Sequence, residues 1–165
     1  MCALARHRQG RRVGQRAFTL IELIVVIVLL GTLSAFAGPR FFDNGALDER
    51  RYQDELAAAL RYAQKVAVAS GCAVRIDIAS TSYALNQQPA SGGHCNAASS
   101  AYDVPVLLPS GDVMQGAAPG AVTVSPAQSI VFDALGRTSL ISDQTFVVGS
   151  RNIVVRADSG LVTTP

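Results

Sequence analysis

The sequence predicts an α+β protein in which one long N-terminal helix packs on an antiparallel, β-rich C-terminal domain. Three observations support this prediction: an apolar run over residues 18–37, apolar residues at helical spacing over residues 52–70, and short period-two segments divided by glycines after Gly71. Helical and strand patterns that occupy separate parts of one chain are typical of α+β folds. The 165 residues suffice for one domain of ordinary size.

The positive charge of the chain is concentrated at its N-terminus. The 14 basic and 12 acidic residues leave a formal charge of only +2, which does not favour a nucleic-acid-binding protein. Five arginines and no acidic residue lie in residues 1–17, so the remaining chain has nine basic and twelve acidic residues. The basic character therefore belongs to this leading segment alone.

The apolar run follows the basic segment directly. Residues 18–37 read FTLIELIVVIVLLGTLSAFA, with Glu22 as the one charge. A helix of this length spans roughly 30 Å, the thickness of a hydrocarbon core. The run is apolar on all sides, unlike a surface helix. We predict a transmembrane helix over residues 18–38, with the arginines in the cytoplasm and the remaining chain translocated.

The same segment also fits a cleavable secretory signal. Residues 23–33 would be its apolar core, and Ala35-Phe36-Ala37 would be an A-x-A cleavage site. Cleavage after Ala37 would release a secreted periplasmic binding domain. The length of the apolar run and the position of Glu22 count against this alternative, but on these features alone both interpretations stay open.

The residues Ala17-Phe18-Thr19-Leu20-Ile21-Glu22-Leu23 resemble the processing site of type IV prepilins and type II secretion pseudopilins. The resemblance implies that residues 1–17 are a leader peptide, which a prepilin peptidase cleaves between Ala17 and Phe18, and that Phe18 is then N-methylated. Glu22 becomes the fifth mature residue, where it would act in assembly by pairing with the free amine of a neighbouring subunit's Phe18. Pro39 becomes the twenty-second, where pilins of this group carry a helix-bending proline. Ala17 departs from the family, which usually has glycine before the cleaved bond.

Later segments resemble minor pilins of the pseudopilin H class, with the nearest likeness to the mannose-sensitive haemagglutinin (MSHA) pilus. They are residues 41–43, 60–67, 70–72 and 132–137. The resemblance implies a type IV pilin-like fold and a structural subunit, with no enzymatic activity and no cofactor, for assembly or initiation of a type IV pilus or type II secretion pseudopilus. Its implied partners are other pilin or pseudopilin subunits, the prepilin peptidase, the inner-membrane assembly platform and the membrane. The C-terminal domain would be periplasmic before the subunit enters the filament.

Beyond the membrane we expect the helix to continue over residues 39–71, with a bend at Pro39 and an end at Gly71. One face of this helix is predicted to be buried, and its positions are Tyr52, Leu56, Ala59, Leu60, Ala63, Val66, Ala67 and Ser70. The opposite face is predicted to be charged, and it carries Arg50, Arg51, Asp54, Glu55, Arg61 and Lys65.

Residues 72–165 are predicted to form the β-rich periplasmic domain. Val74, Ile76 and Ile78 alternate with polar residues, which indicates a half-buried strand, and a return strand begins near Tyr83. Residues 88–100 have no periodicity and are expected to form a loop. Further strands are predicted over residues 103–108, 122–125, 130–132, 138–141, 145–148 and 152–157.

Two cysteines are expected to remain in the mature chain. Cys2 lies in the leader, whereas Cys72 and Cys95 lie in a domain placed outside the cytoplasm, where an oxidising environment favours a disulfide. The bond would fasten the loop to the start of the first strand, and closing a loop of about 24 residues is worth roughly 3 kcal/mol. The alternative is two unpaired thiols.

Other candidate chemistry is sparse. His94, next to Cys95, gives with Cys72 three of the four ligands of a typical zinc site, so we expect an ordinary loop histidine and no metal. No nucleophile elbow, phosphate-binding loop or HExxH motif is present, and we predict no enzymatic activity.

Three C-terminal arginines provide one more alternative. Some minor pilins bind DNA through such residues, and Arg137, Arg151 and Arg156 could serve DNA uptake. They are scattered among acidic residues, which favours a solvated surface over a nucleic-acid site.

Overall fold

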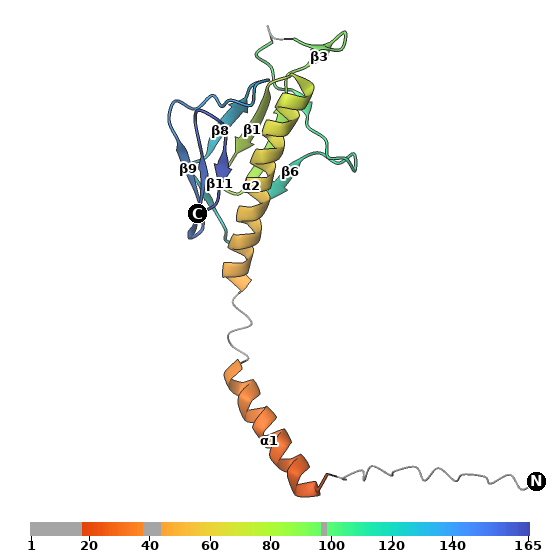
Figure 1. The fold of residues 1–165 in the computed structure, drawn as a ribbon, viewed down its shortest axis with the longest axis vertical. Helices are drawn as coiled ribbons and strands as arrows, with labels where there is room; N and C mark the ends of the chain where they lie inside the picture. The colour runs from red at the N-terminus through yellow and green to blue at the C-terminus, as the bar shows by residue number, and fades with distance from the viewer. Residues whose placement is uncertain (1–17, 38–43, 97–98) are drawn as a thin grey trace, which may run out of the picture. The chain divides into compact units, whose positions relative to one another are not determined.

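The computed structural model describes residues 18–37, 44–96 and 99–165. The chain divides into two units, residues 1–42 and residues 43–165, and each is described by itself (Figure 1).

Over its described residues, 18–37, the first unit forms one helix, α1 (Leu20–Ala37). Thr19 caps the start of the helix, because its hydroxyl Oγ1 accepts a hydrogen bond from the Glu22 amide at 3.3 Å and thereby satisfies a free donor of the first turn. No helix within the described ranges combines the length and apolarity needed to cross a bilayer. The leader peptide and the bend at Pro39 lie outside the described residues, and the membrane span over residues 18–38 stays a prediction.

The second unit starts with helix α2 (Asn44–Ser70). The helix stops at Gly71, whose φ of 69° suits a residue without a side chain. The predicted buried face is confirmed at Tyr52, Leu56, Ala59, Leu60, Ala63 and Ala67. Val66 is half-buried, and Ser70 is exposed, so the prediction was wrong at this last position. The predicted charged face is exposed at all six of its positions.

A first sheet of five strands packs against this helix, and its strands are antiparallel. They are β1 (Val74–Ile78), β2 (Ser82–Gln87), β5 (Val104–Pro105), β6 (Gln115–Ala117) and β8 (Gln128–Phe132). The order is β5-β2-β1-β8, and β6 also pairs with β2. In the central hairpin Ile76 lies opposite Leu85, so both side chains point into the core.

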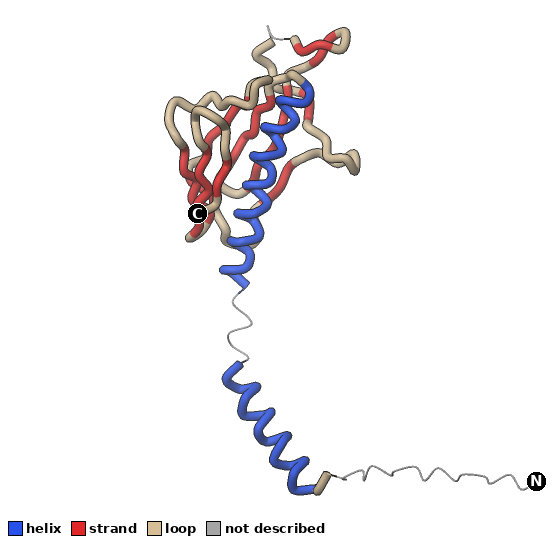
Figure 2. Tube along the Cα trace, viewed as in Figure 1, coloured by secondary structure: helices blue, strands red, loops and turns tan. Residues whose placement is uncertain are grey.

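A second, four-stranded antiparallel sheet completes the core. Its strands, in the order β11-β10-β9-β7, are β11 (Val162–Thr163), β10 (Arg151–Val155), β9 (Gln144–Val148) and β7 (Val124–Ser125). Helix α2 contacts strands of both sheets (Figure 2). The largest buried side chains between these layers include Tyr52, Phe132 and Phe146. The predicted fold, a helix packed on antiparallel sheet, is confirmed.

Several predicted strand boundaries need correction. Residues 138–141 do not form a strand, since only Thr138 makes an isolated bridge, to Phe132. The predicted loop over residues 88–100 contains a short hairpin of β3 (Ala90–Ser91) and β4 (His94–Cys95). The strands β6 and β11 were not predicted; both are two or three residues long, which is too short for a period-two pattern to stand out.

Candidate functional site

The start of α1 presents an exposed apolar surface with one carboxylate. Phe18 is 78% exposed, and the large apolar residues between it and Leu33 are exposed by 42% to 78%. Phe18, Glu22, Leu23, Val26 and Ile27 line a shallow hollow of about 320 Å³ along one face of the helix. Their spacing of about four residues puts them on adjacent turns of that face.

The chemistry of this surface suits a partner that is apolar and carries a positive charge. Exposed apolar area of this extent in water is unfavourable by about 25 cal/mol per Å². Once that area is covered, the Glu22 carboxylate loses its solvation and requires a cation or several hydrogen-bond donors. Ala17 lies outside the described residues, so cleavage between Ala17 and Phe18 stays a prediction.

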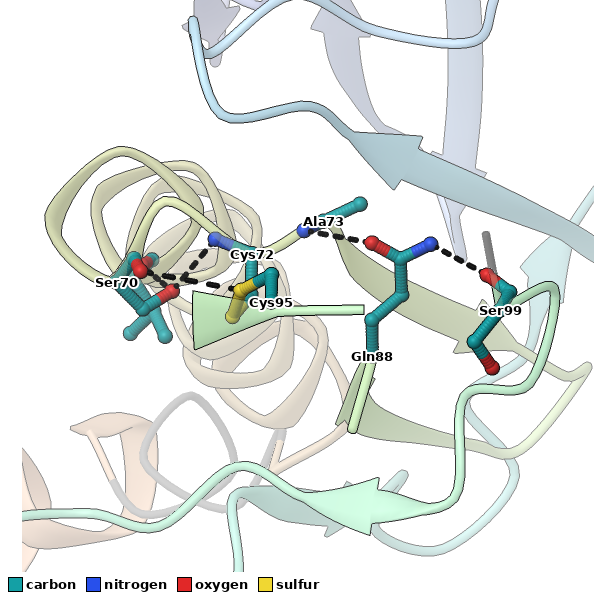
Figure 3. Close-up of a disulfide and its surroundings, with 7 residues drawn as sticks. Ser70, Cys72, Ala73, Gln88, Cys95 and Ser99 are labelled. Carbon is teal, nitrogen blue, oxygen red and sulfur yellow. Dashed lines mark hydrogen bonds between the residues drawn. A yellow bond between two sulfur atoms is a disulfide. The ribbon is translucent and has the colours of Figure 1, made fainter. Parts of the chain in front are cut away.

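A disulfide joins Cys72 to Cys95, as predicted, with their Cα atoms 5.3 Å apart. Cys72 lies two residues beyond the end of α2, and Cys95 belongs to β4. The bond therefore fastens the β3–β4 hairpin to the C-terminal end of the helix (Figure 3). Cys72 is only 4% exposed. The Ser70 hydroxyl Oγ accepts a hydrogen bond from the Cys72 amide at 3.2 Å and orients this corner of the chain.

Gln88 holds the same loop at a second point. Its Oε1 accepts a hydrogen bond from the Ala73 amide at 3.3 Å, and its Nε2 donates to the Ser99 carbonyl at 2.7 Å (Figure 3). The side chain therefore connects the start of β1 to the far end of the loop. Sequence reasoning missed this residue, because a glutamine inside a polar loop gives no signal of such a bridge.

His94 lies beside this disulfide and is exposed. The sulfurs of Cys72 and Cys95 are bonded to each other, which removes them as thiolate ligands. Within the described part of the chain, no three His, Cys, Asp or Glu residues are grouped as metal ligands.

Two of the three C-terminal arginines are paired with acids. Arg137 Nη2 lies 2.8 Å from Asp133 Oδ2, and Arg156 pairs with Asp143. Partial burial of Asp133 acts to raise the pKa of its carboxyl group. Hydrogen bonds from Arg137 and from the Leu135 amide outweigh this effect, so the pKa of Asp133 is lowered. Hydrogen bonds from the Ala157 amide and Arg156 lower the pKa of Asp143. Neutralised in this way, these arginines do not form the cationic patch that phosphate binding needs.

Two further carboxylates attach the sheets to α2. Glu49 accepts two hydrogen bonds from Ser150, which lies in the turn between β9 and β10. Glu55 Oε1 accepts a hydrogen bond from the Tyr83 hydroxyl at 2.7 Å. Burial, followed by this hydrogen bond, raises the pKa of Tyr83, and burial raises the pKa of Tyr52 to about 12. Both tyrosines therefore stay neutral at physiological pH.

A groove of about 850 Å³ lies where β1 and β2 meet β6 and β8. Small residues such as Ala84 and Gly116 form much of its lining, and Asp77 is its one charged residue. The Asp77 carboxylate is already occupied, because it accepts hydrogen bonds from Arg75 Nε at 2.9 Å and from Ser129 Oγ at 2.6 Å. None of the residues that line the groove is a histidine or a cysteine.

Comparisons with known proteins agree with this structure. Residues 12–38 match the prokaryotic N-terminal methylation motif, and residues 53–160 match the type II transport protein GspH. Over 52 residues the chain is 46% identical to the type IV narrow pilus major component PilA5 of Thermus thermophilus, a match that covers 32% of this chain and 45% of that protein. The chain thus spans less than half the length of this curated relative.

The fold is also similar to that of a solved structure. The type IV minor pilin FimU of Pseudomonas aeruginosa, in its crystal form P21, superposes with a TM-score of 0.52 at 17% identity. The similarity covers 73% of this chain and 90% of that chain. The methylation motif includes both Phe18 and Glu22, whereas the GspH match includes α2 from Gln53 onward and almost all of the β-rich region.

Proposed function

Since this chain belongs to the type II transport protein GspH family, whose members are pilin-like structural subunits rather than enzymes, we propose that it takes part in assembling or initiating an extracytoplasmic filament. The filament would be an MSHA-like type IV pilus or a type II secretion pseudopilus. The observation that supports this most strongly is α1, whose large apolar side chains between residues 18 and 33 are all exposed within their own unit. Such a helix requires other apolar surfaces around it.

Membrane and filament would supply those surfaces in turn. Residues 18–38 would anchor the chain in the inner membrane, residues 39–71 would continue into the periplasm, and residues 72–165 would form the periplasmic domain. The Cys72–Cys95 disulfide supports this placement, because such bonds persist in oxidising compartments.

Processing would create the group that Glu22 needs. Hydrolysis of the Ala17–Phe18 bond by the prepilin peptidase frees the Phe18 amine, which is then N-methylated and stays cationic. In the filament this amine would pair with Glu22 of a neighbouring subunit. The assembly platform in the inner membrane and other pilin subunits are the partners that this sequence of steps requires.

The N-terminus of the mature protein tests this proposal. Mass spectrometry of the chain from cell envelopes should find a mature protein that begins at methylated Phe18. A start at Gly38 would instead support the secreted periplasmic binding domain. The third function, DNA uptake, has less support, because Arg137 and Arg156 are paired with acids.

A further inference from the structure

The groove of about 850 Å³ lies on the face of the first sheet that is turned away from α2. The strand register places one residue of β8, β1, β2 and β6 in a single row across this face, in the order Ser129, Asp77, Ala84 and Gln115. All of them line the groove, and none is buried. The adjacent Ile78 points to the other face, where it is buried in the core beside α2.

Small side chains make this face hollow. Ala84 separates Asp77 from Gln115, and in the next outward-facing row Ser82 lies opposite Ala117. These positions differ from most strand positions, which favour larger β-branched and aromatic residues. Two strand spacings separate Asp77 from Gln115, which amounts to about 10 Å. The resulting volume falls in the range of sites that hold small molecules.

Asp77 is held in one orientation inside this groove. Its Oδ2 accepts a hydrogen bond from Arg75 Nε at 2.9 Å, and its Oδ1 accepts one from Ser129 Oγ at 2.6 Å. The Arg75 guanidinium in turn lies 5.0 Å from the centre of the Tyr102 ring, a cation–π contact. Each bond to Asp77 uses one lone pair of a carboxylate oxygen and leaves another free. The groove therefore contains an acceptor that is oriented before any ligand arrives.

The chemistry of the lining indicates a neutral ligand that is rich in hydroxyl groups. Arg75 balances the charge of Asp77, and the other residues that line the groove are uncharged, so a charged ligand would find no counter-ion. The backbone groups of β1 and β2 pair with neighbouring strands, so an extended peptide lying across them would leave its own amides without partners. Sugar hydroxyls, in contrast, donate to a carboxylate and exchange hydrogen bonds with serine hydroxyls and a glutamine amide.

We propose that this groove binds a short neutral oligosaccharide, with Asp77 and Gln115 as its hydrogen-bond partners on the two sides of Ala84. The separation of about 10 Å between these partners favours linked sugar rings over a single ring. The alanine side chains provide an apolar floor for the C–H groups of the rings. The site belongs to the second unit and does not involve α1, so its failure would leave the proposed filament function untouched.

Ligand-observed saturation-transfer NMR tests the ligand class. The full-length chain would be held in lauryldimethylamine oxide, a detergent without a sugar headgroup, and titrated with maltotriose or chitotriose. At least one of these neutral trimers should bind, with a dissociation constant in the millimolar range. Trigalacturonic acid and trialanine represent an anionic sugar and a peptide, and both should bind more weakly. Absence of binding by both neutral trimers, or equal or tighter binding of either comparison ligand, would overturn the proposal.

Variants of the groove locate the site. Ala84→Phe fills the hollow on a solvent-exposed sheet face and should abolish saturation transfer to the trimer. Thr145→Phe is the matched control, because Thr145 is an exposed position of β9 that does not line the groove. Asp77→Asn keeps the shape of the side chain and removes a charged acceptor, so it should weaken binding about tenfold.

Unchanged binding by Ala84→Phe would place the sugar elsewhere on the chain and overturn the proposal. Melting temperature and an intact Cys72–Cys95 bond verify that each variant folds. Gln115→Ala, which shortens an exposed side chain on the edge strand β6, decides the question if Ala84→Phe does not fold. It should weaken binding several-fold, and wild-type affinity of a folded Gln115→Ala would contradict the role assigned to this amide.

Discussion

Glu49 and Ser150 are joined by two hydrogen bonds although 101 positions separate them in the sequence. Glu49 Oε2 accepts one bond from the Ser150 amide at 3.1 Å and another from the Ser150 hydroxyl at 2.7 Å. The contact holds the turn between β9 and β10 against the first part of α2. It is also charge-assisted, so it depends on Glu49 being ionised.

The stability of the β-rich unit should therefore depend on pH through Glu49. Hydrogen bonds from Ser150 lower the pKa of Glu49 in the folded chain. A lowered folded pKa contributes stability above the unfolded value of about 4.3, and this contribution is lost as pH falls through the folded pKa. Glu49→Gln should lower the melting temperature at pH 7, and the difference from wild type should shrink below about pH 4.

Asp48→Asn is the control for this pH series, because it removes the adjacent acid and leaves both Ser150 hydrogen bonds in place. A melting difference for Glu49→Gln that stays constant from pH 7 to pH 3 would show that ionisation of Glu49 does not matter.

Gly149→Ala should destabilise the unit through two separable effects. Gly149 has a φ of 58°, and a Cβ there would collide with the Glu49 side chain. Gly120→Ala is a matched control, because Gly120 has a φ of 56° and nothing within 4 Å of its Cβ position. Strain alone costs on the order of 1–3 kcal/mol, so Gly149→Ala should lower the free energy of unfolding by more than Gly120→Ala does.

A double-mutant cycle in urea denaturation isolates the collision. Adding Glu49→Ala to Gly149→Ala removes the clashing side chain, so the two substitutions together should cost less than the sum of their separate effects. Simple additivity would exclude the collision as a cause.

The Cys72–Cys95 disulfide should be present in protein taken from the envelope. Both cysteines should resist alkylation until a reductant is added. Replacing both with serine should reduce the free energy of unfolding by roughly 3 kcal/mol, because the unfolded chain loses a closed loop of about 24 residues. Alkylation of either residue without reductant would contradict the oxidised state.

Patterns of apolar residues in the sequence predicted those elements of the fold that depend mainly on neighbouring residues. The buried face of α2 follows from apolar residues at helical spacing, and six of its eight predicted positions are fully buried. Residues 138–141 show the limit of such patterns. Thr138 and Leu140 alternate with polar Ser139, but the preceding chain turns around the Asp133 carboxylate, which accepts hydrogen bonds from the amides of Leu135 and Arg137. Pairing with β8 ends at Ser139, whose amide donates to the Val131 carbonyl, and Ile141 is fully exposed.

The candidate site likewise has features that the sequence could predict and features that it could not. The cysteine pair could be predicted, because only two cysteines follow the expected leader and the compartment expected for them is oxidising. The Ser150 contact of Glu49 and the burial of Gln53 could not, because both depend on which strands pass over α2. Gln53 is 4% exposed, and its Nε2 donates to the Asn152 carbonyl at 2.8 Å, which makes a buried amide tolerable.

The central claim is that Glu22 acts in assembly and not in folding. Glu22 lies in the first unit, whereas the buried core residues of the described ranges all lie in the second. Glu22→Val should therefore leave expression, the Cys72–Cys95 bond and thermal unfolding of the second unit unchanged. The substitution should weaken only the assembly of the filament, where the amine of a neighbouring subunit's Phe18 would be left without a carboxylate in an apolar environment. By some estimates an unpaired charge of this kind costs about 3 kcal/mol.

The most direct measurement is the amount of tagged chain recovered with sheared filaments, compared between wild type and Glu22→Val at equal expression. Thr32→Val serves as a control, because it introduces the same side chain on α1 and leaves Glu22 in place. The account predicts that wild type and Thr32→Val enter filaments and that Glu22→Val is reduced about tenfold or more, as a loss of 1.4 kcal/mol or more would give. Incorporation of Glu22→Val at the wild-type level would contradict the role assigned to Glu22.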